Sequence, residues 1–220
     1  MTRQLAYRST LIVSTFGERL KTVFRGLTAG LIVSLVVGGG VWFLSAAVPW
    51  KTVNESSTLL SRFCEWLYLT DGSVGIRESI YLFPIIEGLH LLGIAMSVGV
   101  LCWFDFRLLG LALRDEPVSK VWAQVMPWAL GGFVLMLVTG LLLFWAEALT
   151  AYHSFHFWLK LSLILLAGVN ALVFESTVRR NITAWDRDAV PPLNARLAGA
   201  LSLILWTAII VTGRTMAYTF

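Results

Sequence analysis

Residues 121–146 read VWAQVMPWALGGFVLMLVTGLLLFWA and carry no charged side chain. At a rise of about 1.5 Å per residue, a helix over this stretch exceeds the roughly 20 apolar residues that cross the hydrocarbon core of a bilayer. The stretch therefore predicts a transmembrane helix, and it places the chain among the membrane proteins.

Similar apolar stretches lie on both sides of this one. They cover residues 27–50, 79–104, 155–174 and 197–218. Together the five stretches predict an all-α integral membrane bundle of about five transmembrane helices, with the two termini on opposite sides of the bilayer. We expect a single transmembrane domain at residues 27–220, preceded by a basic arm at residues 1–26.

The composition agrees with lipid as the solvent. Of the 220 residues, 57% are hydrophobic and 14% are charged, whereas a soluble domain carries roughly 25% charged residues. The formal net charge of +4 comes from basic residues in short loops rather than from one stripe, which argues against a nucleic-acid partner. Two cysteines are too few for a disulfide framework, and they leave the redox compartment undecided.

The basic residues predict the orientation of the bundle. Those of the arm and of two loops lie on one side: Arg3, Arg8, Arg19, Lys21, Arg25, Arg107, Arg114, Lys120, Arg179, Arg180, Arg187 and Arg196. The other side holds Lys51, Arg62 and Arg77. Because Lys and Arg concentrate in cytoplasmic loops, twelve against three predicts a cytoplasmic N-terminus and a C-terminus on the outer side.

One short segment outside the spans has a helical pattern. In residues 58–69 the apolar side chains recur at helical spacing, while Arg62 and Glu65 lie elsewhere on the helix surface. We expect a short helix on the outer membrane interface. The arm, at residues 4–24, could form a similar helix on the cytoplasmic face or be a disordered basic tail.

Four ionisable residues fall inside predicted spans, where such groups cost several kcal/mol unless they are paired or hydrated. They are Glu87, His90, Lys160 and Arg214. Glu87 and His90 are three residues apart and share a helix face. His90 could be an axial ligand of a haem iron, a member of a proton relay, or a structural hydrogen-bond donor. In the first role, Glu87 could orient its ring.

Two more histidines lie in the predicted outer link between the third and fourth spans. His153 and His156 have a spacing that could hold copper or zinc, with Glu147 as a third ligand. They could equally be interfacial histidines beside aromatic residues, or His156 could be a second axial ligand to a haem bound by His90.

The two cations inside spans also have two interpretations. Lys160 and Arg214 lie near the outer interface, so both could extend their charged ends into water. Alternatively they could anchor an anionic group, such as a haem propionate, a quinone carbonyl or Glu87. For Thr139, Asn170 and Trp206 we expect hydrogen bonds between helices and nothing more.

Residues 77–93, RESIYLFPIIEGLHLLG, and residues 105–110, DFRLLG, resemble a family of small bacterial membrane proteins without an assigned function. The closing Gly213-Arg214 and Ala217-Tyr218 are similar to that family too. The resemblance extends from about Ser61 to the C-terminus, and it implies a multi-pass protein of the bacterial cytoplasmic (inner) membrane.

A more distant resemblance is to the bacterial four-helix protoporphyrinogen oxidases and the copper resistance D membrane family. It rests on Leu89-His90 followed by Arg107-Leu108, and on Trp158-Leu159-Lys160-Leu161. In the oxidases the matching histidine is implicated in haem binding, which implies that role for His90. A second histidine of their later helix is replaced here by Asn170.

The leading hypothesis is a membrane b-type haem protein that transfers electrons between an outer-side donor and a quinone or partner subunit. His90 would be the axial ligand, and Glu87, Lys160 and Arg214 would set its electrostatics. The alternatives are copper or other metal handling or transport, and a non-catalytic accessory subunit. Besides lipid, we expect a membrane or periplasmic redox partner or a second copy of the chain. Whether the protein is an enzyme stays open.

Overall fold

The computed structural model describes residues 59–216 and residue 218, and all regular secondary structure within them is helical. Four helical segments are long and apolar enough to cross a membrane: α4 (Leu82–Leu108), α5 (Val118–Ala146), the segment Phe155–Ala184, and α8 (Leu193–Met216). The prediction of a multi-pass all-α protein is confirmed to this extent. The predicted arm and the predicted span at residues 27–50 lie outside the described residues.

Three of the four spans begin earlier or later than predicted. α4 begins after Ser79, whose Oγ accepts a hydrogen bond from the Leu82 amide at 3.1 Å. α5 begins at Val118, directly after Pro117, because a proline readily precedes a first helical turn. α8 begins at Leu193, after Pro191-Pro192.

The segment Phe155–Ala184 changes its winding toward its end. It consists of α7 (Phe155–Val173), a π-helical turn η1 (Phe174–Val178) and a 3-10 turn η2 (Arg179–Ala184). The first of these parts matches the predicted fourth span. The two turns carry the chain out of the bundle toward the start of α8.

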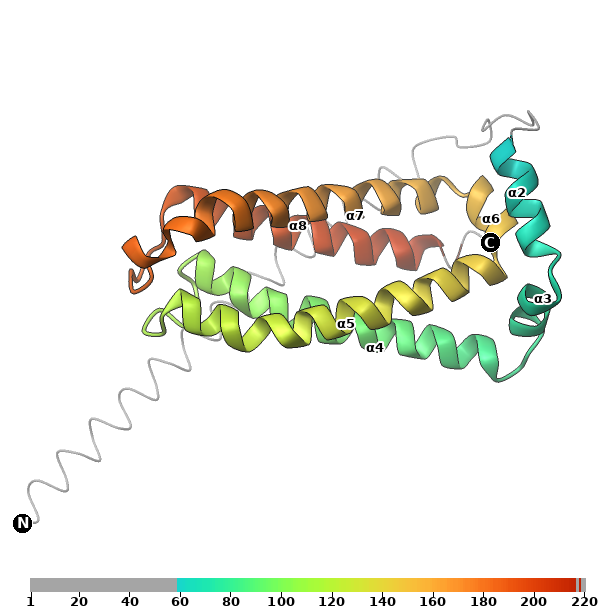
Figure 1. Cartoon of the computed structure of the whole chain (residues 1–220), viewed down its shortest axis with the longest axis horizontal. Helices are drawn as coiled ribbons and strands as arrows, with labels where there is room; N and C mark the ends of the chain where they lie inside the picture. Colours follow the sequence, from blue (N-terminus) through green and yellow to red (C-terminus); the bar gives the residue numbers. More distant parts are fainter. Residues whose placement is uncertain (1–58, 217, 219–220) are drawn as a thin grey trace, which may run out of the picture.

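Three short helices gather at one end of the bundle (Figure 1): α2 (Leu59–Tyr68), α3 (Asp71–Arg77) and α6 (Ala148–His153). α2 confirms the helix expected at residues 58–69, whereas α3 and α6 were not predicted. We call this the α6 end. The opposite end carries the α4–α5 loop, η1 and η2, and we call it the basic end because Arg107, Arg114, Lys120, Arg179, Arg180, Arg187 and Arg196 all belong to these segments or adjoin them.

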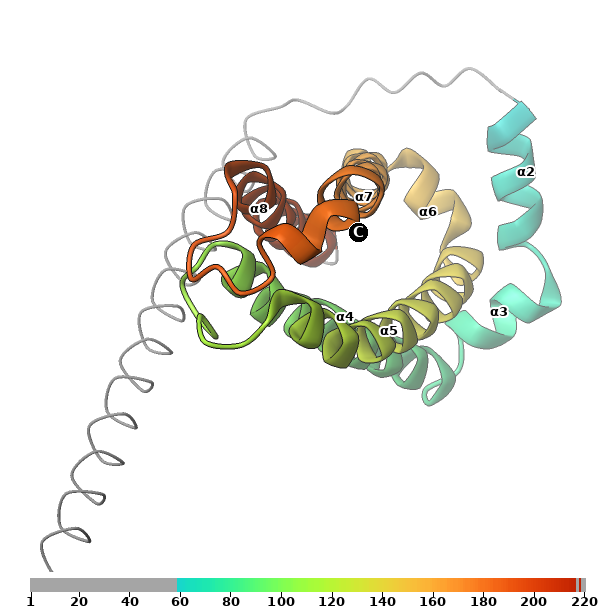
Figure 2. The same ribbon diagram turned by 60° about the vertical axis from the view of Figure 1, so that its left-hand side comes forward.

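The long helices form two hairpins, α4 with α5 and α7 with α8. The hairpins are joined along α4 and α8, while α5 and α7 lie apart on the other side (Figure 2). Many leucines on the outer faces are exposed, including Leu130 (56%), Leu165 (71%) and Leu172 (70%). Apolar surface of this extent indicates a lipid bilayer environment.

A cluster of buried residues closes the basic end, and Arg107 lies beside it. The cluster consists of Phe104, Leu108, Val118, Val121, Phe174, Trp185 and Ala195. Arg107 has no exposed surface. Its Nε donates to the carbonyl of Glu116 at 2.8 Å, and its Nη2 donates to the carbonyl of Asp188 at 3.0 Å. We expected Arg107 only as a charge in a loop. In the structure it connects the α4–α5 loop to the segment that precedes α8.

A second arginine has a similar role at the α6 end. The guanidinium of Arg77 donates from Nη1 to the carbonyl of Ala146 at 2.9 Å and lies over the Tyr68 ring at 3.7 Å. Ser73 donates to the carbonyl of Trp145 at 3.0 Å. These contacts attach α2 and α3 to the end of α5.

Candidate functional site

The interface between α4 and α5 positions His90. Gly93 and Gly132 bring the two helices into direct backbone contact, as a Cβ atom on Gly93 would lie 3.0 Å from the carbonyl oxygen of Gly132. Small residues allow such close packing in membrane helices. One turn toward the α6 end, His90 of α4 faces Thr139 and Gly140 of α5.

The side chains of His90 and Thr139 make a hydrogen bond across this interface. The His90 Nδ1 and Thr139 Oγ1 atoms are 3.0 Å apart. The Thr139 hydroxyl is itself 2.6 Å from the carbonyl oxygen of Leu135, to which it donates its single proton. The His90 Nδ1 is therefore the donor to Thr139. This assigns the proton of the neutral imidazole to Nδ1 and leaves the Nε2 lone pair for a ligand.

The space beside the ring depends on a glycine. A Cβ atom on Gly140 would approach the His90 Cε1 atom to 3.1 Å, so a larger residue at this position would press on the imidazole. Thr139 is buried and His90 is half-buried. The ring is thus held on one side and accessible on the other.

Lys160 of α7 lies near this histidine. Lys160 is close enough to His90 for an electrostatic interaction, and its side chain passes along Gly213 of α8, where an added Cβ would be 3.3 Å from Nζ. Within the described part of the chain, Lys160 has no acidic partner. The structure therefore places one histidine and one cation from different hairpins on the same side of the bundle interior.

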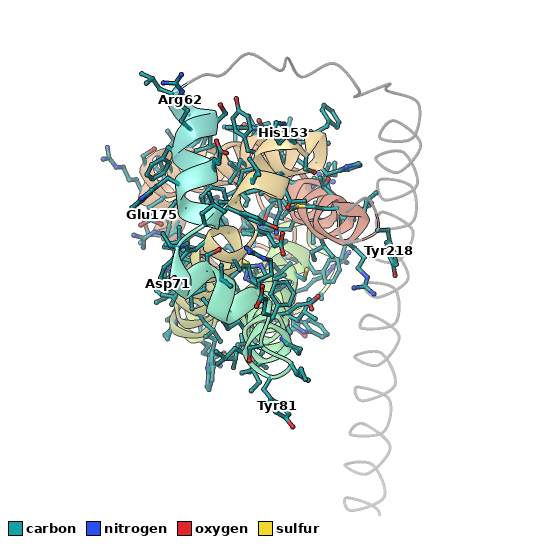
Figure 3. All side chains as sticks on the ribbon, turned by 90° about the vertical axis from the view of Figure 1, so that its right-hand side faces the viewer. Arg62, Asp71, Tyr81, His153, Glu175 and Tyr218 are labelled. Carbon is teal, nitrogen blue, oxygen red and sulfur yellow. The ribbon has the colours of Figure 1, made fainter. Side chains whose placement is uncertain are left out.

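Two residues predicted to act with His90 are placed differently. Glu87 is half-buried and makes no hydrogen bond or ion pair among residues 59–216, so Thr139 rather than Glu87 orients the ring. Arg214 is exposed and donates from Nη2 to the Tyr218 hydroxyl at 3.0 Å. Tyr218 projects from the side of the bundle (Figure 3), so Arg214 does not join Lys160 in one anion anchor.

The residues predicted to hold copper or zinc do not converge. His153 is exposed at the edge of the α6 end (Figure 3), whereas His156 is 3% exposed and its Nε2 atom is buried without a hydrogen-bond partner. Glu147 accepts a hydrogen bond from Thr150 at 2.9 Å. Among the described residues, no group of three His, Cys, Asp or Glu side chains could hold a metal ion.

Sequence reasoning did not find Asp105, which is 4% exposed near the basic end of α4. Ser202 of α8 lies near its carboxyl group, and the Oδ2 atom has no partner. The carboxyl borders a cavity of about 260 Å³ between the four long helices. In the sequence, Asp105 and the nearby Arg107 mark the end of an apolar stretch. No periodic pattern distinguished Asp105 from the charged residues of the loops.

Comparison with known proteins assigns the chain to a family. A model for a family of unknown function, DUF6644, matches residues 70–219. The chain belongs to this family. The match covers all four long helices of this DUF6644 protein, the His90 environment and the cavity. It agrees with the expected family of small membrane proteins without an assigned function.

No curated protein matches the chain, and no solved structure matches it. The likeness to protoporphyrinogen oxidases and to the copper resistance D family thus rests on the sequence motifs alone.

Proposed function

We propose that the protein is a b-type haem protein of the bacterial cytoplasmic membrane that passes electrons between an outer-side donor and a membrane quinone or a partner subunit. The observation that carries this proposal is the state of His90. Its Nδ1 atom is committed to Thr139 and its Nε2 lone pair is left for a ligand, which is the arrangement of histidines that bind haem iron.

The residues around His90 fit such a group in two further respects. Gly140 lets the imidazole ring pack directly against α5, and Lys160 supplies a cation that a haem propionate could bind. The bound iron would supply one-electron redox chemistry, while the protein would fix the ring, exclude water and provide the positive charge.

A second axial ligand is part of the proposal. His156 has a buried Nε2 atom without a partner, which is unusual for a polar atom in a protein interior. It lies one turn before Lys160 on α7, about 6 Å along the helix axis. His156 belongs to α7, the helix that also carries Lys160, so it is our candidate for a second axial ligand from the other hairpin.

The orientation belongs to the same proposal. Arg107, Arg114, Lys120, Arg179, Arg180, Arg187 and Arg196 gather at the basic end, and cytoplasmic loops are enriched in Lys and Arg. The basic end would therefore face the cytoplasm. His90 would then lie in the outer half of the membrane, toward the α6 end, where a periplasmic donor could reach it.

An absorption spectrum of the detergent-purified protein, oxidised and reduced with dithionite, tests the function. We expect reduced α and Soret bands in the wild type and in His153→Ala, which removes an exposed histidine, and their loss in His90→Ala. A colourless wild type expressed with ample haem would contradict the proposal. It would leave metal handling, recognised by metal content without colour, or an accessory role, recognised by a co-purifying partner.

A further inference from the structure

The cavity near the basic end is a site that the histidine chemistry does not use. Its walls come from α4, α5, α7 and α8, and it holds about 260 Å³. A dry cavity of about 150 Å³ binds benzene in another protein, so this cavity accommodates a substituted ring. The aromatic side chains of Phe133 and Trp206 are part of its lining.

The cavity opens sideways between α5 and α7. Its α4 residues, among them Ser97 and Asp105, are buried. Its exposed lining residues come from α5 and α7, as with Phe133, which is 37% exposed, and Gly168. An occupant therefore enters from the surrounding lipid, because α5 and α7 are the outer arms of the two hairpins.

Two unpaired hydrogen-bond acceptors face this apolar space. The carboxyl group of Asp105 lies near Ser202, and its Oδ2 atom has no hydrogen-bond partner. Asn170 donates from Nδ2 to the carbonyl of Ala198 at 3.0 Å, and its Oδ1 has no partner within residues 59–216. Because Ala198 and Ser202 are one turn apart on α8, the two acceptors lie about 6 Å apart along that helix.

Unpaired acceptors in a low-dielectric cavity are costly, and a ligand that donates hydrogen bonds removes the cost. The nearby Arg107 donates from Nε and Nη2 to loop carbonyls. Its buried Nη1 has no hydrogen-bond partner, so among the described residues Arg107 does not satisfy Asp105. A lipophilic cation would be an alternative partner for a carboxylate, but an apolar cavity disfavours charged groups, which favours a neutral hydrogen-bonding ligand.

We propose that this cavity binds a lipophilic hydroquinone or similar phenol, with Asp105 accepting a hydrogen bond from a ring hydroxyl and Asn170 accepting from a second one. The site stands on its own geometry. Only its assignment to a membrane quinol rather than another phenol rests on the proposed electron-transfer function.

Binding of decyl-hydroquinone to the full-length protein in detergent, measured by isothermal titration calorimetry against empty micelles, tests this. Gly168 lines the cavity on its open side, and a Cβ there meets nothing within 4 Å, so Gly168→Phe places an aromatic ring at this opening without a clash. Gly131→Phe is the matched control, because Gly131 is equally unobstructed and does not line the cavity. We expect at least about tenfold weaker binding in Gly168→Phe and unchanged binding in Gly131→Phe.

Asp105 is tested separately. Asp105→Leu keeps the approximate volume and removes the acceptor, so we expect about tenfold weaker binding, about 1.4 kcal/mol. Asp105→Asn keeps an acceptor oxygen, so we expect most of the affinity to remain. Wild-type affinity in Asp105→Leu would overturn the role of Asp105. If Asp105→Leu does not fold, the Gly168→Phe variant still tests the cavity.

Several results would overturn the site itself. These are the absence of saturable binding, equal loss in both glycine variants, or tighter binding of tetraphenylphosphonium that also depends on Asp105. A photocrosslink from Gly168→Cys, labelled with benzophenone maleimide, to residues 27–50 would show that the chain's own segment fills the cavity. Retained hydroquinone binding in a colourless His90→Ala protein would support the site. The two proposals can therefore fail independently, because the spectrum tests haem and the titration tests the cavity.

Discussion

Gly93 of α4 and Gly132 of α5 face each other so closely that a Cβ atom on Gly132 would lie 2.8 Å from the carbonyl oxygen of Gly93 and 2.5 Å from the amide nitrogen of Ser97. The contacted atoms belong to the backbone, which cannot rotate away. The interface that holds His90 against Thr139 therefore depends on the absence of two side chains.

Replacement of Gly132 by alanine should separate α4 from α5. We expect a loss of about 1–3 kcal/mol, as is typical of overpacked interiors, and a lower midpoint in a thermal unfolding scan of the detergent-purified protein. Gly131→Ala is the control, because its added Cβ meets nothing within 4 Å. Equal midpoints for the two variants would mean that the close approach does not stabilise the fold.

Replacement of Thr139 by valine keeps the shape and removes the acceptor of the His90 Nδ1 proton. If His90 binds haem, we expect about 10–100-fold weaker haem affinity, the usual effect of losing such a supporting partner. Thr139→Ser retains the oxygen and should behave like the wild type in a haem titration followed in the Soret region. Unchanged affinity in the valine variant would separate Thr139 from any haem site.

Replacement of Arg107 by methionine should destabilise the basic end. It removes charge-assisted hydrogen bonds to the carbonyls of Glu116 and Asp188, for which we expect a loss of about 3 kcal/mol. Hydrogen exchange should increase in the α4–α5 loop and at the start of α8. Arg180→Met removes an exposed charge from the same end and should leave exchange unchanged.

The thiol of Cys64 should react slowly. Cys64 is 2% exposed between α2 and α6, and burial raises its pKa above the ordinary value of 9.0. The thiolate is the reactive form of cysteine. Two proteins with a single cysteine can therefore be compared: Cys102→Ser, which keeps Cys64, and Leu59→Cys in a chain without Cys64 and Cys102. At pH 8, iodoacetamide should label the first more slowly than the second. Leu59 is 87% exposed in the same helix.

The sign of the pH effect on stability follows from the same burial. The folded thiol stays protonated where an unfolded one would ionise, so this contribution is fully present below about pH 9 and falls as the pH rises further. A labelling rate for Cys64 equal to that of Leu59→Cys at every pH would contradict the buried placement.

The proposed orientation predicts which residues an impermeant maleimide reaches in intact cells. In a chain whose native cysteines are replaced by serine, His153→Cys at the α6 end should be labelled directly, and Arg180→Cys at the basic end only after lysis. Both native side chains are exposed. The opposite pattern would invert the topology and place the Asp105 cavity in the outer half of the membrane.

The sequence predicted what depends on local apolar runs. Long apolar stretches located the four described spans within a few residues, and helical spacing located α2. It did not predict α3 and α6, which are too short to show a period. α3 is held by contacts from Ser73 and Arg77 to the end of α5.

For the candidate site, the sequence indicated which residue types matter but not which residues they contact. A hydrogen bond to another helix was one of three roles that the sequence left open for His90. Sequence spacing suggested Glu87, on the same helix, as the residue that orients its ring, where the structure has Thr139 from another helix. Asp105 and Arg107 are two residues apart and both buried, but one faces the cavity and the other the loops. That difference arises from the packing of α8 and cannot be read from α4 alone.

The hydrogen bond from Arg107 to the carbonyl of Asp188 spans 81 residues of chain. During synthesis, α4 and α5 leave the ribosome together with Glu116, the nearer acceptor of Arg107, long before Asp188 is made. The α4–α5 hairpin must therefore wait in the insertion machinery or the membrane with this guanidinium incompletely bonded. The bond from Arg107 to the carbonyl of Asp188 can form only once translation has passed the α7 span. Packing of the basic end around Arg107 therefore follows completion of the α4–α5 hairpin.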